Sequence, residues 1–267
     1  MKVILFTNAR DEKHIKEWVA HHLNLGFDCI HIFDHKSIEP IKNLFKPNPK
    51  LTVKRIELID NIKSSCMKKA IILAKTYDWM IYLDADEFLV LNNHLTIQDF
   101  ISSYKDINQI LLNWVFFGSN FLSNEPSGMM LENYIRCHSK INKHVKSLVR
   151  PNAVIDIYNA HVYKTNNPNN PNKSRSCYNL LPMNIKEPWF MSIPDKSYSD
   201  IPAYVAHYVN QSYDKYNDRR LSRQRDDGTP ISRIYTEEEL HTIDNDLINT
   251  TVRDKYCSKN AELMETL

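Results

Sequence analysis

Residues 81–91 read IYLDADEFLVL and place three carboxylates inside an otherwise apolar stretch. Ile-Tyr-Leu precedes them and Phe-Leu-Val-Leu follows, which is the composition of a buried β-strand. Carboxylates are costly to remove from water, and neighbouring ones repel each other unless a proton or a cation lies between them. The stretch therefore predicts a strand whose end carries a polar site at Asp84, Asp86 and Glu87.

The segments around this stretch alternate between strand-like and helix-like patterns. Runs rich in β-branched and aromatic residues predict strands, and apolar residues at three-to-four spacing predict helices. The expected strands cover 3–7, 29–33, 51–56 and the segment from 79 onward, and the expected helices cover 15–25 and 64–77. This order is typical of an α/β protein whose central sheet is mostly parallel and is flanked by helices.

The second half of the chain has a less regular pattern. Strands are expected at 110–117, 147–149, 154–158 and 204–209, and the segment 165–176, rich in Asn, Pro and Lys, is expected to form an exposed loop. Thr236 and Glu239 form a Thr-x-x-Glu capping signature. The C-terminal residues are therefore expected to form a helical tail.

The composition argues against several classes of protein. A net charge of +2 over 267 residues disfavours a general nucleic-acid binder held by a basic surface. The five cysteines form no CxxC pair, and the four glycines form neither of the common nucleotide-binding loops. No apolar run approaches the ~20 residues that a membrane helix needs, so we expect a soluble, cytoplasmic protein without a membrane span.

Polar residues follow the first, second and fourth expected strands, at 8–12, 34–37 and 84–87. The carboxyl ends of parallel strands meet at one edge of a sheet, and ligands bind there in such folds. Two aspartates at this edge favour a hard divalent cation, Mg²⁺ or Mn²⁺, which leaves coordination positions for water and phosphate oxygens. The alternative is an acidic turn that caps a helix or pairs with lysines.

Further motifs along the chain resemble those of a known family. They are RDE at 10–12, EWVAHH at 17–22, LG at 25–26, IFD at 32–34 with Ser37, Trp79 with LDADEF at 83–88, Trp114 with FGS at 117–119, KSLVRP at 146–151 and HY at 207–208. Together they resemble glycosyltransferase family 92 and related family-2-like enzymes of GT-A fold. The resemblance implies one GT-A-like domain at 1–225, with a nucleotide-sugar half at 1–110 and an acceptor half at 111–225, and a helical extension at 226–267. The chain departs from the family pattern at Glu39, and at 120–121 where a glycine is common.

The activity that the resemblance implies is that of a metal-dependent glycosyltransferase of the hexosyltransferase type. It would move a sugar, with inversion, from a nucleotide sugar, a UDP-sugar in the first instance, to a hydroxyl of a glycan or other acceptor. The metal, Mn²⁺ or Mg²⁺, would be held by Asp84, Asp86 and a later histidine, for which His207 is the first choice and His161 the second. Glu87 would either support this site or serve the local structure alone.

Donor contacts are assigned from positions at the strand ends and on the late basic segment. The residues expected to bind the nucleobase and ribose are Thr7, Asn8, Arg10 and Asp34. Lys215 is expected to neutralise the diphosphate. Arg219 and Arg220 are either further phosphate ligands or part of a solvated basic helix face.

Inverting transfer needs a general base near the acceptor hydroxyl, usually an Asp or Glu. The candidates are Glu125, Glu132 and Asp156, and Glu132 is preferred, so that Asp86 and Glu132 form the expected catalytic pair. The aromatic residues at 114, 116 and 117 either stack on a sugar ring or belong to the core.

Two other functions remain open from the sequence. A different metal-dependent phosphate enzyme, such as a nucleotidyltransferase or a phosphohydrolase, would explain the paired aspartates but not the motifs at 17–22 and 117–119. A catalytically silent glycan-binding module would keep the fold without binding a donor.

Overall fold

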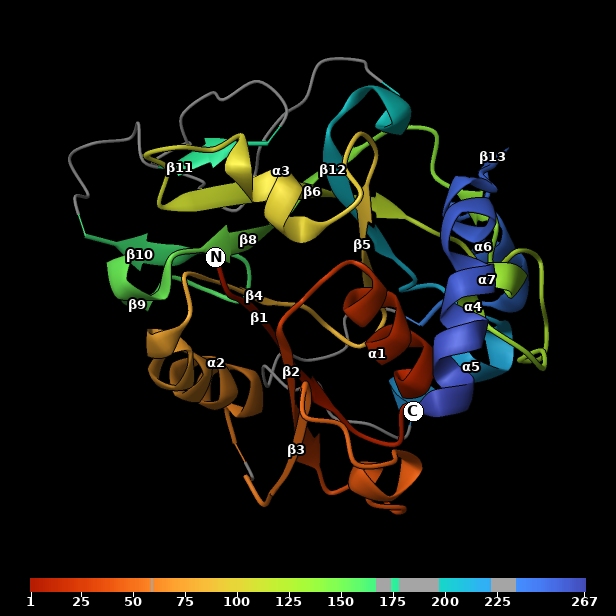
Figure 1. Cartoon of the computed structure of the whole chain (residues 1–267). Helices are drawn as coiled ribbons and strands as arrows, with labels where there is room; N and C mark the ends of the chain where they lie inside the picture. The colour runs from red at the N-terminus through yellow and green to blue at the C-terminus, as the bar shows by residue number, and fades with distance from the viewer. Residues whose placement is uncertain (59, 167–173, 178–196, 222–233) are drawn as a thin grey trace.

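A nine-stranded mixed sheet forms the centre of the computed structural model, which describes residues 1–58, 60–166, 174–177, 197–221 and 234–267 (Figure 1). The strand order is β3-β2-β1-β4-β8-β6-β12-β5, and β11 pairs with β6 outside this path. The strands are β1 Val3–Ala9, β2 Cys29–His35, β3 Leu51–Ile56, β4 Trp79–Tyr82, β5 Glu87–Leu91, β6 Gln109–Phe116, β8 Asn142–Val149, β11 Ser174–Ser176 and β12 Ala203–His207. Strands β1 to β4 pair in parallel, whereas β8 and β5 each run antiparallel to their neighbours. The expected α/β fold is confirmed.

Two smaller antiparallel pairs and several helices complete the described structure. The pairs are β9 Val154–Ile157 with β10 Tyr163–Thr165, and β7 Arg136–Cys137 with β13 Leu247–Ile248. The helices are α1 Ile15–Asn24, α2 Ile62–Leu73, α3 Ile97–Ser102, α4 Met130–Asn133, α5 Tyr213–Leu221, α6 Glu237–His241 and α7 Thr251–Thr266, and short 3₁₀ turns lie at Ile41–Leu44, Ala74–Thr76, Pro151–Ala153 and Tyr198–Asp200. Within these ranges no helix combines the length and apolar character needed to cross a bilayer.

The two faces of the sheet are buried by different helices. Alternate side chains of a strand point to opposite faces, so Val3 and Leu5 share a core with Trp18 of α1, whereas Ile4 and Phe6 share one with Met67 of α2. Figure 1 shows α1 beside α7 on one side and α2 on the other. Because both faces are covered, the strands carry continuous apolar runs, as the sequence shows.

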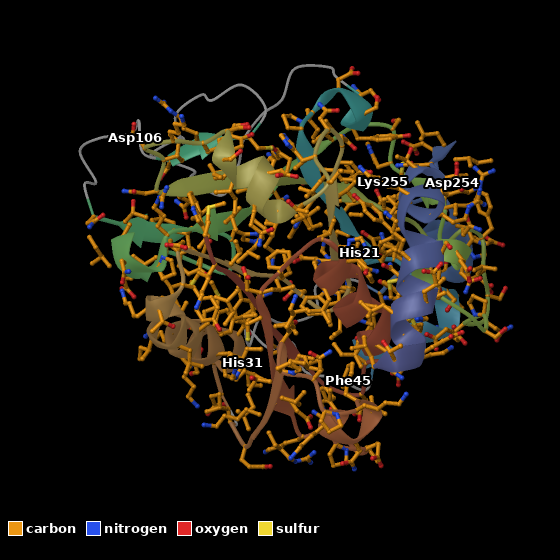
Figure 2. The ribbon with its side chains drawn as sticks, viewed as in Figure 1. His21, His31, Phe45, Asp106, Asp254 and Lys255 are labelled. Atoms are coloured by element: carbon orange, nitrogen blue, oxygen red, sulfur yellow. The ribbon has the colours of Figure 1, made fainter. Side chains whose placement is uncertain are left out.

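The EWVAHH motif fastens helix α1 to strand β5. Trp18 Nε1 donates to the Glu87 carbonyl (2.7 Å), and His21 Nε2 donates to the Leu89 carbonyl (2.8 Å). His22 accepts from the Leu89 amide at Nε2 (3.3 Å) and donates from Nδ1 to the Trp18 carbonyl. His21, labelled in Figure 2, is fully buried, and burial lowers its pKa to about 4. The motif is therefore a core element, and it fixes the strand that begins at Glu87.

Several expected boundaries shift. Strands β1 and β2 continue to Ala9 and His35, and helix α2 begins at Ile62. The expected loop at 165–176 is strand at both ends, because β10 pairs with β9 and β11 pairs with β6, and its residues 167–173 lie outside the described part. Helix α6 carries the predicted capping box. The predicted boundary at 225 falls within 222–233, also outside the described part, and stays a prediction.

Candidate active site

A cavity of about 810 Å³ lies along the carboxyl edge of the parallel strands. Its wall contains residues from the ends of β1 and β2, the 84–86 segment, β12 and α5, so the structure brings together the polar strand ends at 8–12 and 84–87. The lysine and arginine side chains in the wall are Arg10, Lys36, Lys63, Lys146, Arg219 and Arg220, and the acidic ones are Glu12, Asp60, Asp84 and Asp86. The described wall therefore has two more cationic than anionic side chains, which suits an anionic ligand.

The segment between β4 and β5 is a turn that presents Asp84 and Asp86. The Glu87 amide donates to the Asp84 carbonyl (3.0 Å), and the Asp84 amide donates to Glu87 Oε2 (2.8 Å). Strand β4 lies beside β1, whereas β5 lies at the far edge beside β12. The turn therefore crosses the end of the sheet, and its carboxylates project where several strands end.

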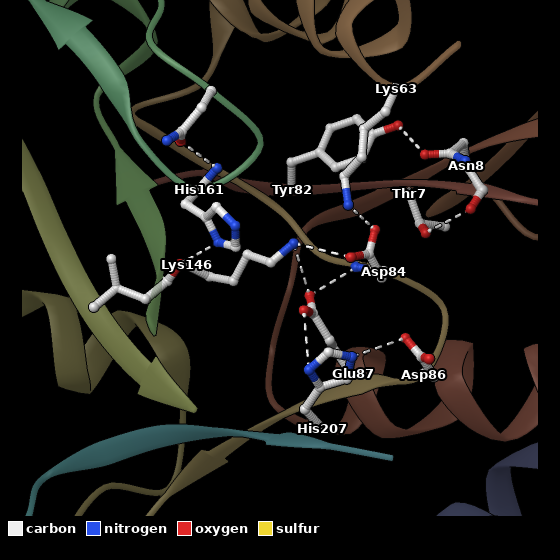
Figure 3. A network of polar contacts seen from close by, with 12 residues as sticks. Thr7, Asn8, Lys63, Tyr82, Asp84, Asp86, Glu87, Lys146, His161 and His207 are labelled. Atoms are coloured by element: carbon white, nitrogen blue, oxygen red, sulfur yellow. Dashed lines mark hydrogen bonds and ion pairs between the residues drawn. The ribbon is translucent and has the colours of Figure 1, made fainter. Parts of the chain in front are cut away.

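Both oxygens of Asp84 bind lysine ammonium groups. Lys63 of α2 binds Oδ1, and Lys146 of β8 lies 3.0 Å from Oδ2 (Figure 3). Burial alone would raise the pKa of Asp84, but Lys146 and Lys63 outweigh it and hold the pKa well below its ordinary value. In this arrangement the lone pairs of Asp84 are directed at two ammonium groups, and its role as a metal ligand stays a prediction.

Glu87 lies beneath the turn rather than at the cavity surface. Its side chain is fully buried and 3.2 Å from Lys146 Nζ. Burial raises the pKa of Glu87 to about 8 despite this lysine. Because it holds the Asp84 amide, the geometry favours the structural one of the two roles that the sequence left open.

Asp86 faces His207 and Arg219. Its Oδ1 is 3.6 Å from His207 Nε2, and its Oδ2 accepts from Arg219 Nη2 (2.8 Å). Burial lowers the pKa of His207 to about 4, so the imidazole is neutral near pH 7. A carboxylate and a neutral imidazole facing each other across 3.6 Å are chemically suited to share one divalent cation. Across the described ranges, this cavity included, no group of three or more His, Cys, Asp and Glu side chains that could hold a metal is found.

The residues expected to bind the nucleobase and ribose divide into two groups. Asn8 and Arg10 line the cavity, and Asn8 Oδ1 accepts from the Tyr82 hydroxyl (2.8 Å). Thr7 is fully buried beneath them. Asp34 is also buried and lies outside the wall: Oδ1 accepts from the Ser37 amide, and Oδ2 from the Ile41 amide and Arg55. The structure therefore gives Asp34 a role in the turn after β2, and the next two residues, His35 and Lys36, reach the cavity instead.

The expected phosphate ligand and general bases lie away from the main cavity. Lys215 is 4.0 Å from Glu125 and outside the wall, whereas Arg219, one helical turn later on α5, reaches it. Glu132 is exposed, and its carboxylate accepts from the Met129 amide at the N-terminus of α4 (3.5 Å). Asp156 lines a neighbouring pocket of about 240 Å³. The preference for Glu132 as base is therefore not supported by its position.

Three imidazoles surround Trp114 in the cavity wall. The ring centroids of His144, His161 and His207 lie 5.3, 5.1 and 4.5 Å from that of Trp114. His161 Nδ1 donates to the Val145 carbonyl (3.0 Å), and burial with the nearby Lys146 and Lys63 lowers its pKa to about 3. In Figure 3 His161 lies beside the Lys146 side chain. All three rings are neutral near pH 7, so they offer nitrogen lone pairs rather than positive charge.

Residues that sequence patterns did not assign to the site are Lys63, Lys146 and His144. Lys146 belongs to the KSLVRP motif, but nothing in its spacing says which acid it meets. The register does: β8 runs antiparallel to β4 with Leu148 opposite Ile81, which brings Lys146 beside the turn that follows β4. Only the sheet pairing could have revealed the contacts of Lys146.

Comparison with known proteins gives a family and a set of distant structures. The model of glycosyltransferase family 92 matches residues 66–250. A glycosyltransferase family 92 protein of Ricinus communis is 24% identical over 153 residues, which cover 53% of this chain and 27% of that protein. The chain thus spans about a quarter of the length of this curated relative.

The similar solved structures are remote. Residues 1–349 of S. aureus TarS share 16% identity with a TM-score of 0.38, covering 57% of this chain and 47% of that one. The same TarS segment in complex with UDP shares 14% identity with a TM-score of 0.39 and the same coverage. HddC from Yersinia pseudotuberculosis shares 12% identity with a TM-score of 0.36, covering 63% of this chain and 85% of that one. At such TM-scores these similarities add nothing to an argument about function.

Proposed function

Because this chain belongs to glycosyltransferase family 92, we propose that it transfers a hexose from a nucleotide-sugar donor, in the first instance a UDP-sugar, to a hydroxyl of a glycan or other acceptor, with inversion. The observation that carries the proposal is the arrangement of Asp86, His207 and Arg219 at the carboxyl edge of the sheet, inside a cavity with excess positive charge. This arrangement matches the chemistry of a leaving nucleoside diphosphate, which is a multiply charged anion.

The diphosphate would be bound by the cationic side chains of the cavity wall. Lys63 and Lys146 flank Asp84, and Arg219 flanks Asp86, so both aspartates hold cations at the cavity surface. Lysine and arginine bind phosphate oxygens through charge-assisted hydrogen bonds. In glycosyl transfer, negative charge grows on the departing diphosphate, so these side chains would stabilise the transition state as well as the bound donor.

A divalent cation, Mn²⁺ or Mg²⁺, is part of the proposal. Asp86 and His207 would hold it, since their facing donor atoms and the neutral state of His207 suit such an ion. When bound, it would supply Lewis-acid neutralisation of the diphosphate. Asp84 would act differently, by fixing the ammonium groups of Lys63 and Lys146.

The acceptor hydroxyl would enter beside the group of imidazoles around Trp114. His144 and His161 line the cavity there, and their neutral rings can accept a hydrogen bond from a sugar hydroxyl. None of the three carboxylates predicted as the base lies in this wall.

The test is to incubate the protein with a panel of nucleotide sugars and simple sugar acceptors, with Mn²⁺ and with a chelator, and to measure nucleoside diphosphate release and glycoside formation. Two results together support the proposal: the wild-type product has the inverted anomeric configuration by NMR, and transfer is lost in Asp86→Asn. Retained full activity in that variant contradicts it. Release of pyrophosphate from a nucleoside triphosphate would indicate a nucleotidyltransferase, and phosphate release without transfer a phosphohydrolase.

The same panel addresses the silent-module alternative. A folded wild-type protein that binds glycans but shows no thermal shift with any nucleotide sugar would favour it, since ligands stabilise the folded state by mass action.

A further inference from the structure

Arg219 and Asp86 form an ion pair in the wall of the cavity. Arg219 Nη2 lies 2.8 Å from Asp86 Oδ2, and Asp86 is 4% exposed. The other terminal nitrogen of the same guanidinium, Nη1, is buried and has no hydrogen-bond partner within the described residues. A buried donor without a partner is unfavourable, so this pairing satisfies only part of the hydrogen-bonding capacity of Arg219.

The position of this pair bears on the metal site. Asp86 directs one oxygen at His207 and the other at Arg219. A divalent cation held by Asp86 and His207 would lie close to the guanidinium, and the two positive groups would repel each other. A diphosphate would relieve this repulsion, because its oxygens can accept two parallel N–H bonds from an arginine.

We propose that Arg219 exchanges partners when the donor binds: it neutralises Asp86 in the free protein and binds the diphosphate in the complex, which leaves Asp86 and His207 for the metal. This inference rests on the proposed function. Its consequence is that metal binding depends on the nucleotide. Without nucleotide, the metal competes with Arg219 for Asp86; with nucleotide, Arg219 is drawn away and the metal binds more strongly.

Arg220 is the matched control. It lies next to Arg219 on α5 and lines the same cavity, but its guanidinium packs over the Tyr216 ring, with 5.3 Å from the carbon to the ring centroid. Loss of Arg220 removes a positive charge of the same size from the same cavity. It does not remove the charge that is paired with Asp86. Comparing the two variants therefore separates the exchange from a general change in the electrostatic potential of the cavity.

The experiment measures Mn²⁺ binding to the whole chain by electron paramagnetic resonance and UDP binding by calorimetry. The proteins are wild type, Arg219→Ala and Arg220→Ala, each with and without the second ligand. We expect Arg219→Ala to bind Mn²⁺ alone about tenfold more tightly than wild type, and UDP with Mn²⁺ about tenfold more weakly, a coupling of ordinary allosteric size. For Arg220→Ala we expect no gain in Mn²⁺ affinity. Arg219→Gln, which keeps the aliphatic stem and a polar end without the charge, replaces the alanine variant if that variant melts early.

The sign of the change without nucleotide decides the inference. If the wild-type protein binds both UDP and Mn²⁺, unchanged or weaker Mn²⁺ binding by Arg219→Ala overturns the exchange. The proposed function then still stands. An equal gain in Arg220→Ala also overturns it, because the effect would then be one of overall charge. A wild-type protein that binds neither UDP nor Mn²⁺ overturns the proposed function and the exchange together.

Discussion

The buried ammonium of Lys146 lies 3.0 Å from Asp84 Oδ2 and 3.2 Å from Glu87 Oε2, and so ties strand β8 to the turn between β4 and β5. Its side chain is 1% exposed. The aspartate turn is therefore held from below by a lysine that reaches it from another strand, and the acidic stretch keeps its shape before any ligand binds.

Lys146→Met is expected to lower the free energy of unfolding by about 3 kcal/mol, because removing one partner of a buried ion pair leaves the other charge unpaired. Urea denaturation followed by circular dichroism measures the change. Lys63→Met is the matched control, since it removes the other ammonium from Asp84 at a more exposed position, and we expect a loss of about 1 kcal/mol there. Equal losses in the two variants would contradict the anchoring role of Lys146.

Much of the fold could be predicted because it follows from local pattern. The apolar runs at 3–7, 29–33 and 51–56 are strands β1 to β3, and the polar residues after β1 and β4 do meet at one cavity. Parallel pairing makes that convergence predictable, since it fixes which ends of the strands are adjacent. The antiparallel β8 carries no such signal, and its lysine was missed for that reason.

The sequence does not show what surrounds each predicted site residue. Asp34 and Asp84 look alike in sequence, since each follows an apolar strand. They differ in what surrounds them: two backbone amides and Arg55 use the lone pairs of Asp34, whereas the groups around Asp84 are lysines that line the cavity. The sequence favours Lys215 as the phosphate ligand, since Arg219 could equally belong to a solvated helix face, and only the orientation of α5 shows that Arg219 reaches the cavity.

Asp34→Ala is expected to destabilise the protein without weakening nucleotide binding. The substitution leaves the amides of Ser37 and Ile41 without their acceptor, so we expect a loss of about 2 kcal/mol in unfolding free energy. Calorimetry with UDP should give the wild-type affinity at a temperature where the variant is folded. Asp86→Asn is the contrasting variant, in which affinity for UDP in the presence of Mn²⁺ is expected to be lost. A loss of UDP affinity in Asp34→Ala would restore the ribose contact predicted from the sequence.

The C-terminal helix α7 is joined to helix α1 by a buried polar chain. Asn24 Nδ2 donates to Asn260 Oδ1 (3.0 Å), and Asn260 Nδ2 faces His21 Nδ1 (3.4 Å). Asn260→Leu is therefore expected to lower the unfolding free energy by about 2 kcal/mol, since it leaves buried partners unsatisfied. Ser258→Ala, on the exposed side of the same helix, should change stability little. Chemical denaturation of both variants checks this, and a neutral Asn260→Leu would mean that α7 is held by apolar contacts alone.

Glu17 should make the protein less stable as the pH rises toward neutrality. Its buried carboxyl accepts from the amides of Met130 (2.6 Å) and Leu131 (3.1 Å), and burial raises its pKa from 4.5 to about 7. Between these values the folded chain keeps the proton and the unfolded chain has lost it, so stability from this group falls with rising pH and levels off above about pH 7. Glu87, with a pKa of about 8, acts in the same direction. Glu17→Gln should reduce the downward slope by up to ~1.4 kcal/mol per pH unit, measured by urea denaturation between about pH 5 and pH 8. Identical slopes in Glu17→Gln and wild type would show that Glu17 is ionised throughout this range.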